Sequence, residues 1–528
     1  MKIPFAAVAL VALQNVFLQN SAEAACAPDP LEFSETIGMQ VEKVGSVPAK
    51  NTDAWTYNMG TADSFDEYPI YFIDQKEGLV FSYDEDGTVS KVFDMTESAI
   101  PAGMTISWTW GGASQEARVQ QLSQGAREGE VFVVLMSSTL PDGWDKADAE
   151  LPAAGAFPGW ACTADNGKDP VFLRDLYRIG EQPSCFDNGA GLVGFTVYQV
   201  FVKYCIDDDG SLIDPEPFFV LENQMTPGHF GGGIATVDKG KILWSVGDCL
   251  TFGTTGLYAP QLDSEHCGKI LLIDPDNGEY EVAAKGVRNS QQFRVIKQED
   301  RRNLVSRSLK GGKGKKKGKN KNKGKQKGSD ELLVFMDIGG VTAEEMNAKS
   351  LDAILDTKEI ENFGWGRSIE DGYAREGTFY VKPGSTGTLG TQPPCEEDAP
   401  IPEEGYEQPW IQFGRTANDY FYAISSFVVA SASFMDLALI WTEFNTGLVL
   451  GTTEAFVDGA APAKSYKIKL FDTDGNYLEN GFNDLVLEEL GEVGYYRGDP
   501  RMFHYPDGTA GVFIERTGCF YKLTEIAL

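Results

Sequence analysis

Three histidines occur in the 528 residues of this chain, and histidine is the side chain that most readily acts as a base near neutral pH. They are His229, His266 and His504. His229 stands in the segment 227–235 (PGHFGGGIA), whose glycines on both sides would let a flat ligand approach the backbone closely. The strand-like segment 241–248 (KILWSVGD) follows at once, so we expect the imidazole at the end of a sheet and not inside it. A histidine placed there either serves as a base or caps a turn.

A second candidate site is the pair Arg288 and Asn289. It follows the strand-like segment 268–275 (GKILLIDP) and comes just before an aromatic residue that begins another strand, within 284–293 (AKGVRNSQQF). A guanidinium is always charged and an amide offers both donors and an acceptor, so the pair could bind the carbonyl groups of a cofactor. Arg-Asn dipeptides are also ordinary on protein surfaces.

A third candidate site lies in the segment 334–341 (VFMDIGGV). The backbone carbonyls of Gly339 and Gly340, beside carboxylates, are the kind of oxygen ligand that calcium prefers. Trp365, in the segment 362–366 (NFGWG), could form the wall of a sugar site. The simpler interpretation is a strand, a turn and the start of a helix, with the tryptophan in the core.

Taken in this order and spacing, the three segments resemble the soluble glucose/sorbosone dehydrogenase family, quinoproteins built on a six-bladed propeller. The resemblance is clearest between residues 191 and 379 and extends more thinly to residue 523. The matching segments are Gly191–Phe195, the glycines after His229, Val246–Asp248, Gly268–Ile270, Lys285–Asn289, Asp337–Gly339, Phe363–Trp365 and Pro506–Gly508.

The resemblance implies a site that holds pyrroloquinoline quinone and calcium and oxidises an aldose at its anomeric carbon. His229 would be the base that takes the hydroxyl proton while hydride passes to the quinone. Arg288 and Asn289 would bind the quinone and stabilise its reduced anion. The carbonyls of Gly339 and Gly340 would bind the calcium. A near-neutral base and a fixed cation are what this chemistry requires.

Several positions depart from the pattern of this family. Gly228 stands where an acidic residue is expected before the histidine, and a cofactor-contacting lysine has no counterpart near residues 452–456. The arginines expected to bind the cofactor ahead of the Pro-Asp-Gly turn are Arg497 and Arg501, out of register with the family. Two functions therefore remain open: a sugar dehydrogenase, or a non-catalytic extracellular binding propeller that has lost part of the cofactor site.

The elements that must position these residues are short strand-like segments ending in Asp/Gly turns. Asp and Asn tolerate left-handed backbone and Gly adopts it freely, so each turn indicates a hairpin. Several turns stand some thirty residues apart, which suits four-stranded blades. We predict an all-β fold, a six-bladed β-propeller with a few short helices, one of them over 342–357. The turns are 84–87, 207–210, 238–240, 274–278, 472–475 and 506–508.

Composition and charge further narrow the class of protein. Hydrophobic residues make up 42% and charged residues 23%, which excludes global disorder, and a net charge of −33 argues against general nucleic-acid binding. The segment 308–329 is rich in lysine and glycine and is predicted to be a disordered insert. It either binds an anionic polymer or surface or is a tolerated loop expansion; a lysine-rich matrix protein carried by a propeller is a third possibility.

The N-terminus predicts a secreted protein. Residues 1–25 have a lysine, a nine-residue apolar run and small residues, the pattern of a signal peptide, and the run is too short to span a membrane. Eight scattered cysteines then favour disulfides, and we expect a Cys249–Cys267 pair around one long loop. The propeller would comprise residues 26–307 and 330–528, with a small sugar as its substrate.

Overall fold

The computed structural model describes a little over half of the chain, and the statements below concern that part. The candidate residues His229, Gly340, Arg497 and Cys249, together with the segments 1–25 and 308–329, lie outside it. The described residues are 31–47, 62–63, 68–74, 78–96, 98–104, 107–110, 113–116, 119–150, 195–225, 231–237, 240–248, 259–263, 265–296, 331–339, 343–366, 374–381, 405–414, 423–429, 434, 437–444, 446–491 and 498–528.

Four of the sheets have four or five strands each and follow one another along the chain. The first contains β2 (Ala62–Asp63), β3 (Ile70–Asp74), β4 (Leu79–Tyr83) and β5 (Val89–Asp94). The second contains β8 (Val119–Gln124), β9 (Glu130–Ser137), β10 (Phe195–Ile206) and β11 (Leu212–Met225). The third contains β12 (Gly231–Thr236), β13 (Ile242–Val246), β14 (Lys269–Ile273), β15 (Tyr280–Lys285) and β19 (Glu361–Asn362). The fourth contains β16 (Phe293–Ile296), β17 (Leu332–Asp337), β18 (Ala343–Ser350) and β22 (Ile411–Gly414).

The remaining large sheet has nine strands. One antiparallel run is β23 (Ile424–Val429), β24 (Leu439–Glu443), β25 (Val449–Thr452) and β26 (Tyr466–Phe471), with β27 (Tyr477–Leu478) paired to β26. The other is β28 (Pro500–His504), β29 (Ala510–Ile514), β30 (Cys519–Ala527) and β1 (Glu32–Ser46). Two small hairpins pair β6 (Ser107–Trp110) with β7 (Ala113–Glu116), and β20 (Ala374–Glu376) with β21 (Phe379–Val381).

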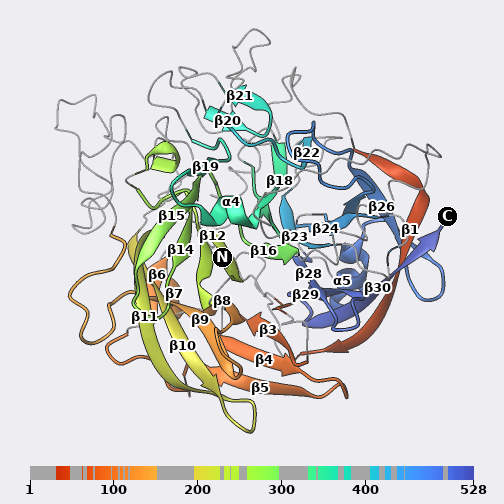
Figure 1. Ribbon diagram of the computed structural model, residues 1–528. Coiled ribbons are helices and arrows are strands. Elements are labelled where there is room, and N and C mark those ends of the chain that lie inside the picture. Colours follow the sequence, from red (N-terminus) through yellow and green to blue (C-terminus); the bar gives the residue numbers. More distant parts are fainter. Residues whose placement is uncertain are drawn as a thin grey trace, which may run out of the picture.

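The sheets are arranged in a ring around a common centre (Figure 1). The innermost strands of neighbouring sheets lie against each other: β8 contacts β12, β12 contacts β16, β23 contacts β28, and β28 contacts β2. The described helices are short, namely α4 (Leu351–Leu355), α5 (Phe482–Leu490) and the 3₁₀ turn η3 (Ala259–Gln261). The predicted all-β, propeller-like architecture with few short helices is confirmed.

The described strands form fewer separate blade-sized sheets than the six blades that the sequence predicts, because β1 joins two strand runs into one sheet. Its residues pair antiparallel with β30, as in Ile37 with Ala527, and parallel with β26, as in Glu32 with Tyr466. One long strand therefore fuses two four-stranded runs into a single hydrogen-bonded sheet and brings residues near the two ends of the described chain together.

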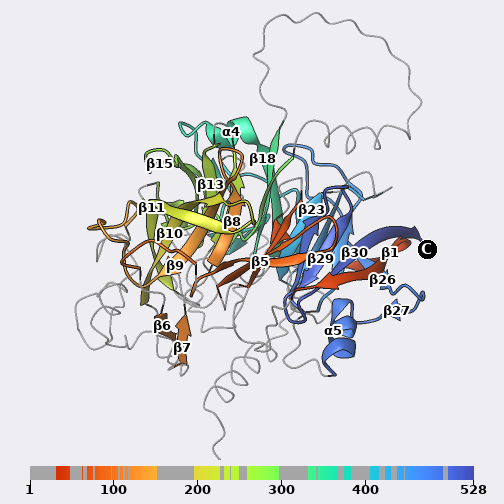
Figure 2. The ribbon, with the colours of Figure 1, turned by 90° about the horizontal axis from the view of Figure 1, so that it is seen from below.

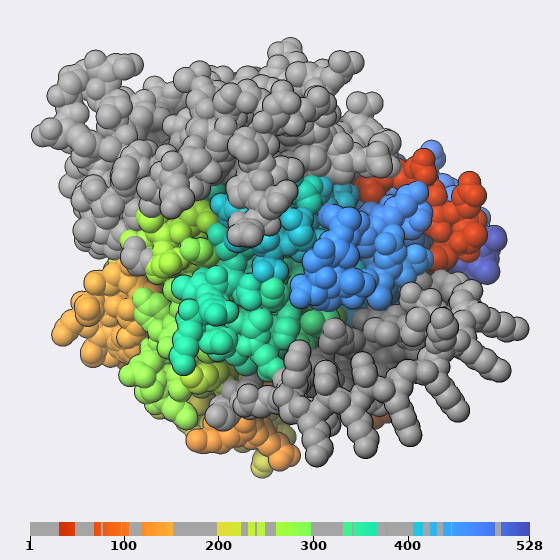
Figure 3. All heavy atoms as spheres, turned by 45° about the horizontal axis from the view of Figure 1, so that its top comes forward, coloured from red at the N-terminus to blue at the C-terminus, as the bar shows by residue number. Residues whose placement is uncertain are grey.

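The two α-helices project from opposite sides of the ring, with α4 above and α5 below in Figure 2. On the side that carries α4, residues near 330–370 and 440–490 lie next to each other at the surface (Figure 3). No helix in the described part of the chain combines the length and apolar character needed to cross a membrane.

The apolar cores lie between the sheets, where the central strands are buried on both faces. Trp244 on β13 packs edge-on against Phe201 on β10, with ring centroids 5.0 Å apart, and joins the second sheet to the third. Trp441 on β24 stacks on Phe413 of β22 at 5.9 Å and joins the fourth sheet to the nine-stranded one. Each large aromatic ring thus fills a wedge between neighbouring sheets and fixes their relative positions.

The helix predicted over 342–357 is wrong for its first half. Residues 343–350 form strand β18, and the helix α4 is limited to 351–355. β18 pairs with β17 on one side and β22 on the other, and Met346 and Ala348 on its one face enter the core. Two sets of ladder hydrogen bonds and this burial outweigh the helix propensity of the segment.

Candidate functional site

Arg288 to Gln292 lead into β16 at the inner side of the ring, and each of these buried residues contacts another sheet or its connections. The carbonyl of Ser290 accepts hydrogen bonds from Gly233 N at 3.0 Å and Ser245 Oγ at 2.8 Å, both in the third sheet. Gln292 Oε1 accepts one from Phe427 N, on β23, at 2.8 Å. The segment containing the predicted arginine–asparagine pair is therefore a junction between sheets.

Arg288 is buried, with 6% of its surface exposed, and its side chain is directed at the turn that follows β17. Nη1 donates to the carbonyl oxygens of Ile338 and Gly339, each at 2.7 Å. The guanidinium carbon lies 5.3 Å from the ring centroid of Trp365, within the range of a cation–π contact. The structure thus brings together three of the residues selected from the sequence: Arg288, Gly339 and Trp365.

Asp337, the last residue of β17, holds the backbone of the pair in place. Its carboxylate oxygens accept hydrogen bonds from Arg288 N at 2.8 Å and Asn289 N at 2.7 Å. Burial raises the pKa of Asp337 to about 7, and the nearby carboxylate of Asp248 adds to this. The sequence marks Asp337 only as part of a motif; the available signal is a carboxylate placed directly after an apolar strand.

Asn289 connects the pair to the beginning of β12. Its Oδ1 accepts a hydrogen bond from Gly231 N at 3.0 Å. Gly231 has a φ of +66°, and a Cβ added there would lie 2.1 Å from the carbonyl oxygen of Ser245. Only glycine fits at this close approach, so the amide of Asn289 fixes a position two residues after His229.

Trp365 is partly exposed but rigidly held. Its indole Nε1 donates to Asp248 Oδ2 at 3.1 Å, and its backbone N donates to the carbonyl of Gly286 at 2.9 Å. Its own carbonyl accepts from Gln261 Nε2 at 2.6 Å. The ring is therefore presented in one orientation, with the guanidinium of Arg288 on its face.

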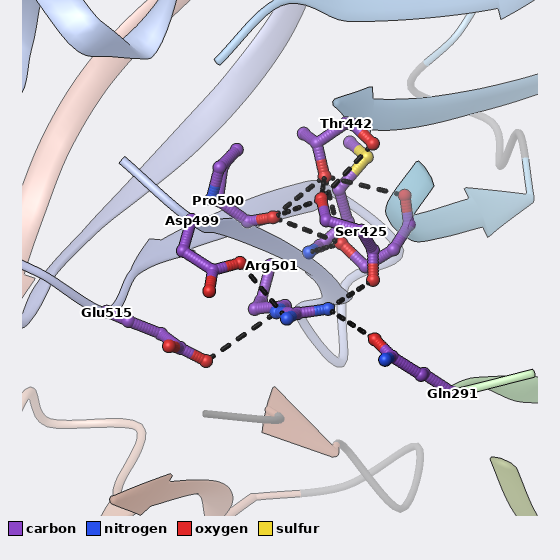
Figure 4. A network of polar contacts seen from close by, with 9 residues as sticks. Gln291, Ser425, Thr442, Asp499, Pro500, Arg501 and Glu515 are labelled. Carbon is purple, nitrogen blue, oxygen red and sulfur yellow. Dashed lines mark hydrogen bonds and ion pairs between the residues drawn. The ribbon is translucent and has the colours of Figure 1, made fainter. Parts of the chain in front are cut away.

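Arg501, on β28, lies at the centre of a separate polar network (Figure 4). Its Nη2 is 3.0 Å from Asp499 Oδ1 and its Nε is 3.5 Å from Glu515 Oε1. Nη1 donates to the carbonyl of Ser425 and contacts Gln291 Oε1 at 3.4 Å. The guanidinium is 2% exposed and burial raises the pKa of Glu515 well above its usual range. Arg501 thus neighbours the junction through Gln291 while its charge is taken up by protein groups.

The two described histidines are bound to main-chain carbonyls away from this junction. His266 Nε2 lies 2.9 Å from the carbonyl of Glu222, and burial lowers the pKa of His266 to about 4. His504 Nε2 lies 2.8 Å from the carbonyl of Val429. Neither contact favours a role as a base near neutral pH.

Of the two carbonyls that the resemblance assigns to calcium, only that of Gly339 lies among the described residues. The carbonyl of Gly339 already accepts a hydrogen bond from a guanidinium, and no group of three or more acidic, histidine or cysteine side chains in the described residues is arranged to hold a metal. For the quinone, a fixed cation is present beside an aromatic ring. Arg288, with Asn289 beside it, is the residue that would hold it.

Of the eight cysteines, Cys205 and Cys519 are free thiols, so not all of them form disulfides. Cys267 is disulfide-bonded. Its expected partner, Cys249, lies outside the described residues, and the pairing stays a prediction.

No family model and no curated protein matches the chain. Among solved structures it is similar to the PQQ-bound form of aldose sugar dehydrogenase from Streptomyces coelicolor, with 13% identity and a TM-score of 0.44 over 92% of this chain and 100% of that one. An oxidoreductase of Thermus thermophilus, named a glucose dehydrogenase, is 12% identical with a TM-score of 0.44, over 93% and 100%. A Trichoderma reesei enzyme of carbohydrate-active family AA12 is 10% identical with a TM-score of 0.41, over 96% and 100%.

The class of enzyme that the sequence resembles is thus represented among the structural neighbours of this chain. None of the three similarities reaches a TM-score of 0.5, and the functional assignment rests on the residues of this chain.

Proposed function

We propose that this chain is an oxidoreductase of the sugar dehydrogenase type, which oxidises an aldose or related sugar with pyrroloquinoline quinone as hydride acceptor. The observation that carries the proposal is the convergence of Arg288, Asn289 and Trp365 with Gly231 at one place on the inner side of the ring. These are a fixed cation, an amide, an aromatic surface and the start of the strand that follows His229.

The position of Gly231 supports a role for His229 in the same site. His229 precedes Gly231 by two positions in the sequence. The Gly231 backbone is bonded to Asn289, the direct neighbour of Arg288. We therefore assign to His229 the role of the base that accepts the proton of the sugar hydroxyl.

The other residues of the site bind and orient the sugar and the quinone. The quinone, when bound, supplies the acceptor for the hydride. Arg288 places a permanent positive charge at the site, and its burial makes that charge more effective than it would be in water. Trp365 offers a flat apolar surface for the sugar ring, and Asp248 keeps the indole in a single orientation through Nε1. Asp337 holds the backbone that carries the arginine.

The test is a dye-linked dehydrogenase assay on protein incubated with the quinone and then desalted. We expect dye reduction with at least one member of an aldose panel, and loss of that activity in His229→Ala. His504→Ala is the matched control, because His504 is bound to Val429 on another sheet. This variant should retain activity. No dye reduction with any sugar, together with no quinone absorbance after desalting, would refute the dehydrogenase.

A second candidate function, a non-catalytic extracellular binding propeller, is favoured by the contacts of two predicted cofactor ligands. The Gly339 carbonyl is bonded to Arg288, and Arg501 is enclosed by Asp499 and Glu515. Part of the cofactor grip is thus engaged in holding the protein together. This candidate predicts that a sugar binds, as measured by tryptophan fluorescence. It also predicts that the protein neither retains the quinone nor oxidises the sugar.

The proposal extends to the architecture and the location of the protein. Counting β23–β26 as a fifth blade and β28–β30 with β1 as a sixth gives the six-bladed ring. The residues between β16 and β17, paired strands of one blade, include the lysine-rich insert, which therefore falls in a hairpin connection. Secretion after removal of residues 1–25 and a Cys249–Cys267 disulfide are tested together by mass spectrometry of the exported protein with and without reduction.

A further inference from the structure

We propose that Arg288 is the resident cation of this site and that it excludes calcium from the carbonyls of Ile338 and Gly339. The inference takes from the proposed function only the location of the site. It predicts that the site works, whatever its ligand, without a divalent ion at these carbonyls.

The guanidinium lies too close to the carbonyls to leave them to a second cation. Arg288 Nη1 is 2.7 Å from both oxygens, which is the length of a charge-assisted hydrogen bond. Calcium binds oxygen at about 2.3–2.6 Å, so an ion on the Gly339 oxygen would lie within about 5 Å of Nη1. Two cations that close, in a buried place, repel each other strongly.

The carboxylates that contact this site are engaged by N–H groups. Calcium takes about six to eight oxygen ligands, from carboxylates, carbonyls and water. Both carboxylate oxygens of Asp337 accept backbone N–H groups, and Oδ2 of Asp248 accepts the indole N–H of Trp365. Among the described residues, the acidic side chains of Asp337 and Asp248 therefore help to position the site.

Arg288 is also held firmly where it is. It donates to two carbonyls, lies over the ring of Trp365, and its own carbonyl accepts from Asp248 N at 2.9 Å. Arginine keeps its charge at all relevant pH values, so the site carries one permanent positive charge. The ligand class it suits is an anion or a carbonyl-rich planar molecule that accepts hydrogen bonds.

Terbium luminescence tests the inference without any turnover. Terbium occupies calcium sites, and its emission on excitation at tryptophan wavelengths requires an indole nearby. Because Trp365 borders these carbonyls, we compare wild type with Trp365→Phe. We expect equal emission from the two proteins, since any terbium on the acidic surface hairpins contributes equally to both. Emission that is stronger in wild type and is displaced by calcium would overturn the inference.

A second comparison tests whether Arg288 itself excludes the ion. Arg288→Met keeps an unbranched apolar stem and removes the charge, and we expect emission that disappears in the double variant with Trp365→Phe. A folded Arg288→Met protein without this gain would show that the arginine is not what excludes the metal. If Arg288→Met does not fold, the comparison of wild type with Trp365→Phe still decides. Because no sugar or dye is involved, failure here is separate from failure of the dehydrogenase assay.

Discussion

Replacement of Arg501 by methionine should destabilise the ring strongly while leaving its apolar volume nearly intact. The guanidinium connects β28 to the carbonyl of Ser425, in β23, and to Gln291 in the junction segment. It also lies against Asp499 and Glu515, both of them buried. Methionine replaces the unbranched apolar stem of the arginine but makes none of these polar contacts.

The size of the effect follows from the charges left behind. Removing one partner of a buried ion pair costs about 3–5 kcal/mol, because the remaining charge has lost its partner in a place that water does not reach. Burial raises the pKa of Glu515 in the folded protein above its unfolded value, so its proton favours the folded state at low pH, and that contribution is lost as the pH rises. The deficit of Arg501→Met should therefore be smaller at pH 5 than at pH 8.

Unfolding in guanidinium chloride, at pH 5 and at pH 8, measures this loss of stability in wild type and variants. Adding Asp499→Asn and Glu515→Gln to Arg501→Met should recover at least half of the lost stability, since no uncompensated charge then remains. Lys43→Met is the control: its ion pair with Glu489, at 3.0 Å, is exposed and should contribute less than about 1 kcal/mol. An Arg501→Met protein as stable as this control at pH 8 would refute the reasoning.

Two further predictions concern the junction and the rim of the ring. Gly231→Ala would place a Cβ 2.1 Å from the carbonyl oxygen of Ser245 at a φ of +66°, and we expect a loss of about 2 kcal/mol or more in urea unfolding; unchanged stability would contradict the close approach. Burial and the neighbouring side chain of Glu407 raise the pKa of Glu361 to about 7, although Lys349 Nζ lies 3.4 Å from Glu361 Oε2. The raised pKa makes stability fall as the pH rises from about 4.5 through 7, so Glu361→Gln should flatten the melting temperature between pH 5 and 8.

Local backbone requirements made the turns predictable. Gly87, Gly210, Gly278, Gly475 and Gly508 all have positive φ and each follows an acidic or amide residue in a connection between paired strands. The requirement for glycine is written in the residue itself, so the sequence reveals it without tertiary information. The hairpins, and with them the all-β class, could be found in this way.

The fusion of two blades and the strand at 343–350 could not be predicted in the same way. β1 pairs with β26, more than four hundred residues away in the chain, and a parallel pairing leaves no local signature. In β18 the sequence AEEMNAKS favours a helix, and only the neighbouring strands β17 and β22 make it extended. Both features depend on partners that are distant in sequence.

The candidate site was found in part. Arg288, Asn289, Gly339 and Trp365 were selected from the sequence and do lie together, but their partners were not foreseen. Arg288 donates to main-chain carbonyls and Asn289 accepts from a main-chain N–H, and main-chain groups are the same in every residue. A sequence motif can therefore identify the side chains of such a site but not the main-chain groups that they contact.

Arg288 and Arg501, two of the buried arginines, are held by different groups. Arg501 lies between the acidic side chains of Asp499 and Glu515. Arg288 is bonded to two main-chain carbonyls and lies over an aromatic face, and Asp337 accepts its backbone N–H group. The proposed function therefore assigns the ligand to Arg288 and a structural role to Arg501. Arg288 also lies at the end of the third sheet at which β12 begins with Gly231, the residue that its neighbour Asn289 binds, so the proposed cation and the first residue of this strand belong to the same end of one sheet.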